Sequence, residues 1–232
     1  MPPVVEAARR AGQLGFDAWW AGDHLVCNAP IPDDALCALS ATAAVTDGIE
    51  LGASLLQPGL RRPAWAAKQP ATVATLAAGQ FRLGVGAGGE YPQEFTAGGV
   101  DRRTRGARLD EIMRVLPLLP RGEPVDHGGP LAPAQVTGLR PTTPTRVPMS
   151  IWGRRPAALR RAARYGDQWM PMWLGPQAVR DLAGCLTALA AQNGRPVPSI
   201  ALLMLTERVD RWTAYGSAQA VADLLREWPG HR

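Results

Sequence analysis

Short apolar runs alternate with amphipathic segments along most of the chain. In the amphipathic segments the apolar residues recur every three or four positions, which predicts helices. Regular alternation of strands and helices favours a parallel α/β fold, either a barrel or an open doubly wound sheet. The apolar runs that predict strands cover residues 16–22, 49–56, 81–85, 148–152, 168–172 and 199–206.

The unit at residues 49–94 organises the rest of the chain. Its helix is predicted to begin at Pro63 and to end at Gly79, between strands 49–56 and 81–85. A strand, a helix and a second strand make a βαβ unit, which requires parallel pairing. The second strand leads into the glycine-rich loop 84–89. Ligands of α/β folds bind where strands end and where glycine lets the backbone come close.

Further helices are predicted from the same spacing and from flanking glycine and proline residues. Asp33 is expected to be the N-cap of the helix that follows the first strand. Residues 121–147 are rich in proline and glycine and contain few apolar side chains. This stretch is predicted to be an irregular excursion or a hairpin. The further helices cover residues 3–14, 34–46, 109–116, 156–165, 176–193 and 218–228.

Length and composition indicate one globular domain. The chain has 232 residues, of which 46% are hydrophobic, so we expect a single domain over 1–232 with a sizeable core. The net charge is +5 and the isoelectric point is about 9.7. The basic residues are scattered arginines, with Lys68 the only lysine. This distribution argues against a nucleic-acid-binding protein, while neighbouring arginines suit phosphate or carboxylate groups.

No membrane segment or metal site is predicted. No apolar run approaches the ~20 residues that a membrane-spanning helix needs, and the first residues lack the apolar stretch of a signal peptide. Cys27, Cys37 and Cys185 do not have metal-ligand spacing, and we interpret them as free thiols of a cytoplasmic protein. The sequence contains no zinc-binding pattern and no GxSxG nucleophile motif.

The glycine-rich loop has three interpretations. Gly84, Gly86 and Gly89 match the GxGxxG dinucleotide fingerprint, which requires a helix directly after the third glycine. No helix is expected here, because Pro92 favours an extended conformation at Tyr91. The other interpretations are a flexible turn and a glycine floor under a flat ring or a phosphate.

Three polar residues are candidates for chemistry. Asp23 and His24 follow the first predicted strand, at the end where barrel enzymes place their catalytic residues. A single histidine is either catalytic or structural, and its carboxylate neighbour at a strand end favours catalysis. Glu90, which follows the glycine-rich loop, is either an acid/base group or a loop cap.

Four stretches of the sequence resemble the bacterial luciferase-like monooxygenase superfamily. They are GFDAWWAGDHL, the whole of residues 49–100, the following RGARLDE, and WGRRPAALRRAARYGDQWMP. They occur in the family's order over most of residues 4–173, with weaker similarity over 216–228. The resemblance implies a TIM barrel that binds FMN or the deazaflavin coenzyme F420. Members of the family transfer hydride or pass electrons to oxygen in monooxygenation.

The resemblance also assigns catalytic residues. Asp23 and His24 match the acid/base pair at the end of the second barrel strand, with His24 near the reactive face of the ring. Glu90 matches a polar position after the fourth strand. Ser54 and Leu55 match a strand bulge, often a non-prolyl cis peptide, that backs the ring.

Further residues are assigned to the cofactor by the same resemblance. Gly86 and Gly88 belong to the glycine-rich loop expected against the cofactor. Gly153, Arg154 and Arg155 match the loop that receives the cofactor phosphate, ahead of a helix N-terminus suited to anions. The two arginines replace small residues common in the family, and their charge also suits an oligoglutamate tail.

The chain departs from the family at both ends. The family has a strand before helix 3–14 and another after helix 218–228, and the sequence predicts neither. We therefore expect an incomplete barrel, which exposes two sheet edges and favours a homo-oligomer. Such a chain is a truncated gene product, a reduced barrel closed by a partner or by local refolding, or the result of a misassigned start.

Two functions remain open from the sequence. The first is an FMN- or F420-dependent oxidoreductase or monooxygenase that acts on a small organic substrate. A flavin reductase or F420 reductase would then be its partner. The second is a catalytically silent flavin-binding or subunit protein of the same fold.

Overall fold

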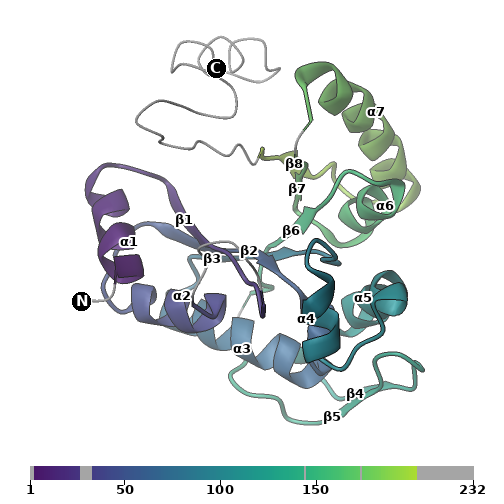
Figure 1. Ribbon diagram of the computed structural model, residues 1–232, viewed down its shortest axis with the longest axis horizontal. Helices are drawn as coiled ribbons and strands as arrows, with labels where there is room; N and C mark the ends of the chain where they lie inside the picture. The colour runs from purple at the N-terminus through teal and green to yellow at the C-terminus, as the bar shows by residue number, and fades with distance from the viewer. Residues whose placement is uncertain (1–2, 27–32, 144, 173, 203–232) are drawn as a thin grey trace. The chain divides into compact units, whose positions relative to one another are not determined.

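The computed structural model describes residues 3–26, 33–143, 145–172 and 174–202 (Figure 1). The chain forms two compact units, Met1–Ser150 and Ile151–Arg232, and each is described by itself. Over residues 3–85 and again over 149–200 the described strands and helices alternate along the chain, as the sequence predicts.

Parallel strands form the centre of the first unit. They are β1 (Ala18–Ala21), β2 (Glu50–Leu56) and β3 (Phe81–Val85), in the order β1-β2-β3. The N–H of Leu83 donates to the carbonyl of Pro148 at 2.9 Å, so the next strand begins beside β3. The parallel pairing predicted for the central βαβ unit is confirmed.

Three helices flank these strands. They are α1 (Pro3–Gln13), α2 (Ala35–Ala43) and α3 (Pro63–Leu76), and they contact one another in sequence order along the strands (Figure 1). The proline at the first position of α3 has its φ already suited to a helix start. Their buried faces consist mostly of alanine, valine and leucine residues, and the alanines let a helix approach a sheet closely. These residues include Val5, Ala8, Ala11, Ala35, Leu36, Leu39, Ala66, Ala67, Ala71 and Val73.

After β3 the chain forms the helices α4 (Pro92–Ala97) and α5 (Arg105–Val115). The predicted apolar face of α5 is confirmed, because Leu109, Ile112 and Val115 are buried. Short 3₁₀ turns cover Pro58–Leu60, Arg102–Thr104 and Leu119–Arg121.

The excursion at 121–147 contains a hairpin. Its strands β4 (Val125–His127) and β5 (Ala134–Val136) pair antiparallel. The buried carboxylate of Glu111 in α5 accepts the N–H of Ala132 at 2.7 Å and so fastens the hairpin turn to the helix.

The second unit continues the alternation. The strand β6 (Met149–Trp152) ends in it and is followed by α6 (Pro156–Tyr165), β7 (Gln168–Met170), α7 (Pro176–Gln192) and β8 (Ser199–Ile200). The strands β7 and β8 pair in parallel, and α6 packs against α7. The predicted helix 218–228 lies outside the described residues.

Two predictions about the first strand and the helix after it are wrong. The N-cap of α2 is Asp34 and not Asp33, because Oδ1 of Asp34 accepts the N–H groups of Leu36 at 3.0 Å and Cys37 at 2.9 Å. The strand predicted to be buried at 16–22 is shorter and half-buried throughout.

The prediction that no helix follows the glycine-rich loop is also wrong. Tyr91 is extended, with φ −109° and ψ 99°, as proline at the next position requires. Pro92, however, occupies the first helical position of α4, where its missing N–H costs no hydrogen bond. The helix therefore begins three residues beyond Gly89.

Replacing Gly52 by alanine is expected to destabilise the first unit by about 1–3 kcal/mol, the usual cost of overpacking. Gly52 lies opposite Trp20 in the sheet, and a Cβ there would overlap the indole ring. Urea unfolding measures the effect. The control is Gly12→Ala in α1, where a Cβ meets nothing within 4 Å and stability should rise slightly. Equal stabilities of the two variants would contradict the packing described here.

Candidate functional site

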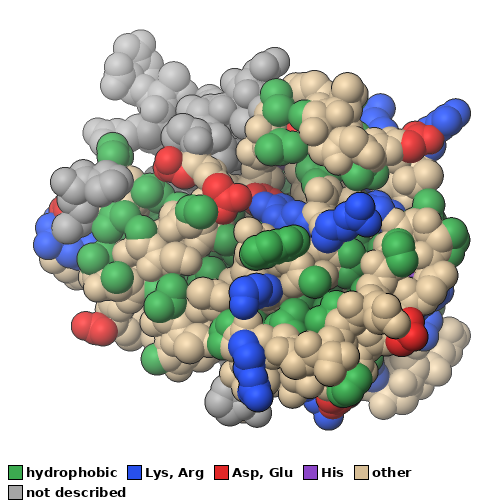
Figure 2. All heavy atoms as spheres, turned by 90° about the horizontal axis from the view of Figure 1, so that it is seen from below, with side chains coloured by type: hydrophobic (Ala, Val, Ile, Leu, Met, Phe, Trp, Pro, Cys, Tyr) green, Lys and Arg blue, Asp and Glu red, His purple; other side chains and the backbone are tan. Residues whose placement is uncertain are grey.

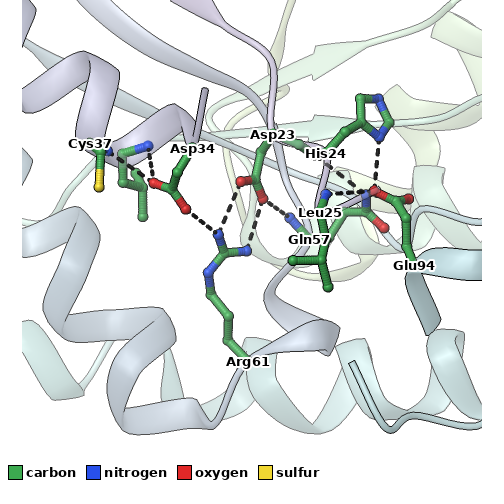
Figure 3. A network of polar contacts seen from close by, with 9 residues as sticks. Asp23, His24, Leu25, Asp34, Cys37, Gln57, Arg61 and Glu94 are labelled. Carbon is green, nitrogen blue, oxygen red and sulfur yellow. Dashed lines mark hydrogen bonds and ion pairs between the residues drawn. The ribbon is translucent and has the colours of Figure 1, made fainter. Parts of the chain in front are cut away.

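The polar residues of the site converge at the carboxyl ends of β1, β2 and β3 (Figure 3). Asp23 and His24 follow β1, and Gln57 follows β2. Arg61 comes from the segment between β2 and α3, and Glu94 lies in α4. Parallel strands bring their carboxyl ends to one edge, so residues far apart in the sequence meet there.

Asp23 forms a buried ion pair with Arg61. The guanidinium binds the carboxylate with two hydrogen bonds, Nη1 to Oδ2 at 2.8 Å and Nη2 to Oδ1 at 3.0 Å. The N–H of Gln57 donates to Oδ2 at 3.3 Å, and Nη2 of Arg61 reaches Oδ2 of Asp34 at 3.4 Å. Burial alone would lower the pKa of Arg61, but its hydrogen bonds to Asp23 and the charges of Asp23 and Asp34 outweigh burial and raise it.

The carboxylate that contacts the His24 ring is that of Glu94. Oε1 of Glu94 lies 3.1 Å from Nδ1 of His24 and accepts the N–H of Leu25 at 2.9 Å. Oε2 accepts Nε2 of Gln57 at 3.0 Å. The side chain of Glu94 is fully buried, whereas that of His24 is 21% exposed. Tyr91 packs edge-on against the imidazole, with ring centroids 4.9 Å apart.

His24 is thus held on one side and open on the other. Its Nδ1 faces Glu94, and its second ring nitrogen points away from the carboxylate (Figure 3). An imidazole held in this way can exchange a proton through Nε2 with a bound molecule.

The end of β2 has the irregular backbone that the resemblance implies. The peptide bond between Ser54 and Leu55 is cis, and the pairing of β2 with β3 shifts register beyond Ala53. The Leu55 side chain packs against Gly86, where a Cβ would lie 2.8 Å from its Cδ2. At Gly88 a Cβ would overlap the side-chain amide of Gln57. The side chains of Leu55 and Gln57 thus lie directly against the glycine backbone of the loop, and a side chain at either position would displace them.

Glu90 lies apart from the His24 contacts. Its side chain is exposed, and the structure gives it no hydrogen bond to a described residue. The neighbouring carbonyl of Gly89 accepts Nη2 of Arg102 at 2.8 Å, which fixes the loop that carries Glu90.

The predicted phosphate loop belongs to the second unit. Gly153, Arg154 and Arg155 connect β6 to α6, and Arg155 is the N-cap of that helix without a side-chain capping bond. Both arginines are exposed. The loop is held in place because the N–H of Gly153 donates to Met170 and its carbonyl accepts Nε1 of Trp169 at 2.8 Å.

Cys37 and Cys185 are free thiols, as predicted, while Cys27 lies outside the described residues. Partial desolvation, and secondarily the carboxylate of Asp34, raise the pKa of the exposed Cys37 thiol. Among the described residues no cluster of potential metal ligands occurs, and none of their helices is long and apolar enough to span a membrane. Figure 2 shows basic side chains interspersed with hydrophobic and neutral ones on the face that it presents.

Sequence reasoning missed three residues of the site: Gln57, Arg61 and Glu94. In the sequence, Arg61 is one of several arginines that occur in pairs, and nothing there distinguishes it from the others. Glu94 stands third in a helix that begins with proline, a position that favours carboxylates, and that signal predicts the helix turn but not its contact with His24.

The family model described as luciferase-like monooxygenase matches residues 2–228. An F420-dependent glucose-6-phosphate dehydrogenase of Beutenbergia cavernae is 37% identical over 168 residues, which cover 68% of this chain and 48% of the relative. The enzyme of the same name from Kribbella flavida is 33% identical over 176 residues, which cover 71% of this chain and 51% of the relative. The chain thus spans about half the length of the curated relatives it matches.

Solved structures show the same fold. The monooxygenase RslO1 from Streptomyces bottropensis superposes with a TM-score of 0.78 at 22% identity, over 86% of this chain and 63% of that one. An F420-dependent secondary alcohol dehydrogenase, in complex with an F420-acetone adduct, superposes with a TM-score of 0.74 at 23% identity, over 86% of this chain and 63% of that one. The described strands follow the order β1-β2-β3-β6-β7-β8, and the predicted α/β fold with a parallel sheet is confirmed. The chain belongs to the luciferase-like monooxygenase family.

Proposed function

We propose that this protein is an FMN- or F420-dependent oxidoreductase, or a monooxygenase, that acts on a small organic substrate within one barrel domain. The observation that carries the proposal is His24, placed at the end of β1 with Nδ1 against the buried carboxylate of Glu94. Relatives that use F420, and a monooxygenase solved in complex with FMN, support this class of cofactor.

The residues present fit such a cofactor. FMN and F420 both carry a phosphate group, and Arg154 and Arg155 precede a helix N-terminus that lacks a side-chain cap. Both also have a flat ring system with an N–H donor. Oε1 of Gln57 is a buried acceptor beside Gly88 with no hydrogen-bond partner among the described residues. When bound, either cofactor would supply hydride transfer, and FMN would also supply the electrons for oxygen.

The chain's own residues have separate roles in this proposal. His24 exchanges a proton with the substrate through Nε2. Asp23 is the proposed partner of His24 in the acid/base pair, and it also holds Arg61 and the start of the loop that follows β2. Glu90 acts as an acid/base group from the rim of the site. Contact with the cofactor is proposed for Ser54, Leu55, Gly86, Gly88, Gly153, Arg154 and Arg155.

Binding of the cofactor is the first test. Purified protein titrated with FMN and with F420 is expected to show saturable changes in absorbance for at least one of them. Arg155→Ala should weaken this binding about tenfold, since one charge-assisted hydrogen bond contributes about 1.5 kcal/mol. The matched control is Arg160→Ala, which removes an exposed arginine farther along α6. The proposal fails if the protein binds neither cofactor.

The remaining predictions concern partners and competence. A homo-oligomer, a flavin or F420 reductase as partner, and a cytoplasmic location stay predictions. Light scattering tests the first, and a monomer at high concentration would contradict it. If the protein binds a cofactor but shows no turnover with the substrates tested, the result would favour a catalytically silent binding protein of this fold.

A further inference from the structure

Glu94 of helix α4 has a completely buried carboxylate. A carboxylate that is completely removed from water is costly unless hydrogen bonds compensate for the lost hydration. Three groups approach it: Nδ1 of His24, the N–H of Leu25 and the side-chain amide of Gln57. They come from the segments after β1 and β2, so Glu94 joins α4 to both.

The direction of two of these hydrogen bonds is fixed. The backbone N–H of Leu25 can only donate. The amide of Gln57 is oriented by a second contact, because its Nε2 lies 3.4 Å from the carbonyl of Asp23, which can only accept. Nε2 therefore also donates to Oε2 of Glu94. Both carboxylate oxygens already act as acceptors before His24 is considered.

The direction of the third hydrogen bond follows from the other two. An ionised carboxylate is an acceptor only, so the hydrogen bond to His24 requires the proton on Nδ1 of the imidazole. The neutral ring then has its lone pair on Nε2, which points away from Glu94 (Figure 3). The Leu25 hydrogen bond holds the backbone that follows His24, so ring and main chain are fixed by one group.

We propose that Glu94 is a positioning residue that keeps His24 in the Nδ1–H tautomer and thereby makes Nε2 the proton-accepting atom. The inference rests on the catalytic role proposed for His24. It assigns to Glu94 the function of orienting the base from behind, with no contact to substrate or cofactor. When His24 takes a proton on Nε2, the same carboxylate stabilises the charged ring.

The test measures the tautomer directly and does not depend on activity. Nitrogen-15 NMR of His24 in the full chain distinguishes the two tautomers by the chemical shifts of Nδ1 and Nε2. The native protein is expected to show Nδ1–H. Glu94→Met, which removes the acceptor without adding a polar group, should lose the Nδ1–H preference. Glu94→Gln is the matched variant: its amide oxygen can take the place of Oε1, which faces both the N–H of Leu25 and Nδ1, so it is expected to keep Nδ1–H.

The control is Glu111→Gln, which removes another buried carboxylate of the first unit, outside the site. It should leave the tautomer of His24 unchanged. Once a substrate is known, Glu94→Gln should lower kcat about 10–100-fold, as for the outer partners of functional histidines, with a smaller effect on KM.

Two results would overturn the inference: native protein with His24 as Nε2–H, or a folded Glu94→Met protein that keeps Nδ1–H. If Glu94→Met does not fold, Glu94→Leu, which also removes the acceptor, decides the same question. The expected tautomers without catalytic turnover would instead refute the proposed function and leave the positioning of His24 by Glu94 intact.

Discussion

His24→Ala is expected to lower turnover per bound cofactor by ~10²–10⁴-fold, the usual contribution of a positioned acid/base group. Cofactor affinity should change little, because the hydrogen bonds of His24 go to Glu94 and not to the predicted phosphate loop. Turnover is measured with cofactor-loaded protein, so that loss of binding is not mistaken for loss of catalysis.

A structural histidine would behave differently. In that case His24→Ala would lower the melting temperature while turnover per folded molecule stayed the same. His127→Ala is the matched control, since His127 also lies near a buried glutamate, with Nε2 3.9 Å from Oε2 of Glu111, but outside the site. Unchanged turnover in folded, cofactor-loaded His24→Ala protein would refute the catalytic role and favour a silent binding protein.

Arg61→Met is expected to reduce the free energy of unfolding by about 3–5 kcal/mol, the cost of leaving a buried charge without its partner. The Asp23 side chain is only 7% exposed and would keep a single hydrogen bond, from the N–H of Gln57. Because the pKa of Arg61 is raised in the folded protein, its stabilising contribution is present at neutral pH and is lost only at strongly alkaline pH.

Denaturation in urea measures this loss. Arg103→Met is the control, because Arg103 pairs with Asp101 at the surface, where its side chain is 90% exposed. Removal of such a pair should leave the free energy of unfolding nearly unchanged. If the two variants were equally stable, Asp23 would be hydrated in solution and the buried ion pair would have no structural role.

The bounds of strands and helices were predicted well where proline or glycine marks both ends of an apolar pattern. The strand at Phe81–Val85 and the helix Pro156–Tyr165 have the predicted bounds, because proline or glycine punctuates both sides of each apolar pattern. The helix α4 was missed because Pro92 was interpreted only through its effect on the preceding residue. Proline at the first position with glutamate at the third is itself a helix-start pattern.

The site was predictable in part. The position of His24 at a strand end followed from the apolar pattern, and the cis peptide at Ser54–Leu55 followed from resemblance to a family; both are confirmed. The pairing of His24 with Glu94 joins residues 70 positions apart. No local pattern encodes that contact, because it depends on how the end of β1 and the start of α4 approach each other in the folded chain.

The ion pair of Arg61 also bears on how the loop after β1 can vary. Asp23 ends the β1 side of this loop, Asp34 caps α2 on the other side, and one guanidinium binds both carboxylates. The two ends are therefore anchored independently of the residues between them. Each doubling of a flexible loop's length costs only about 0.6 kcal/mol of closure entropy. Exchange of the residues between Leu25 and Asp33 is accordingly expected to leave the anchoring cation and the helix cap in place.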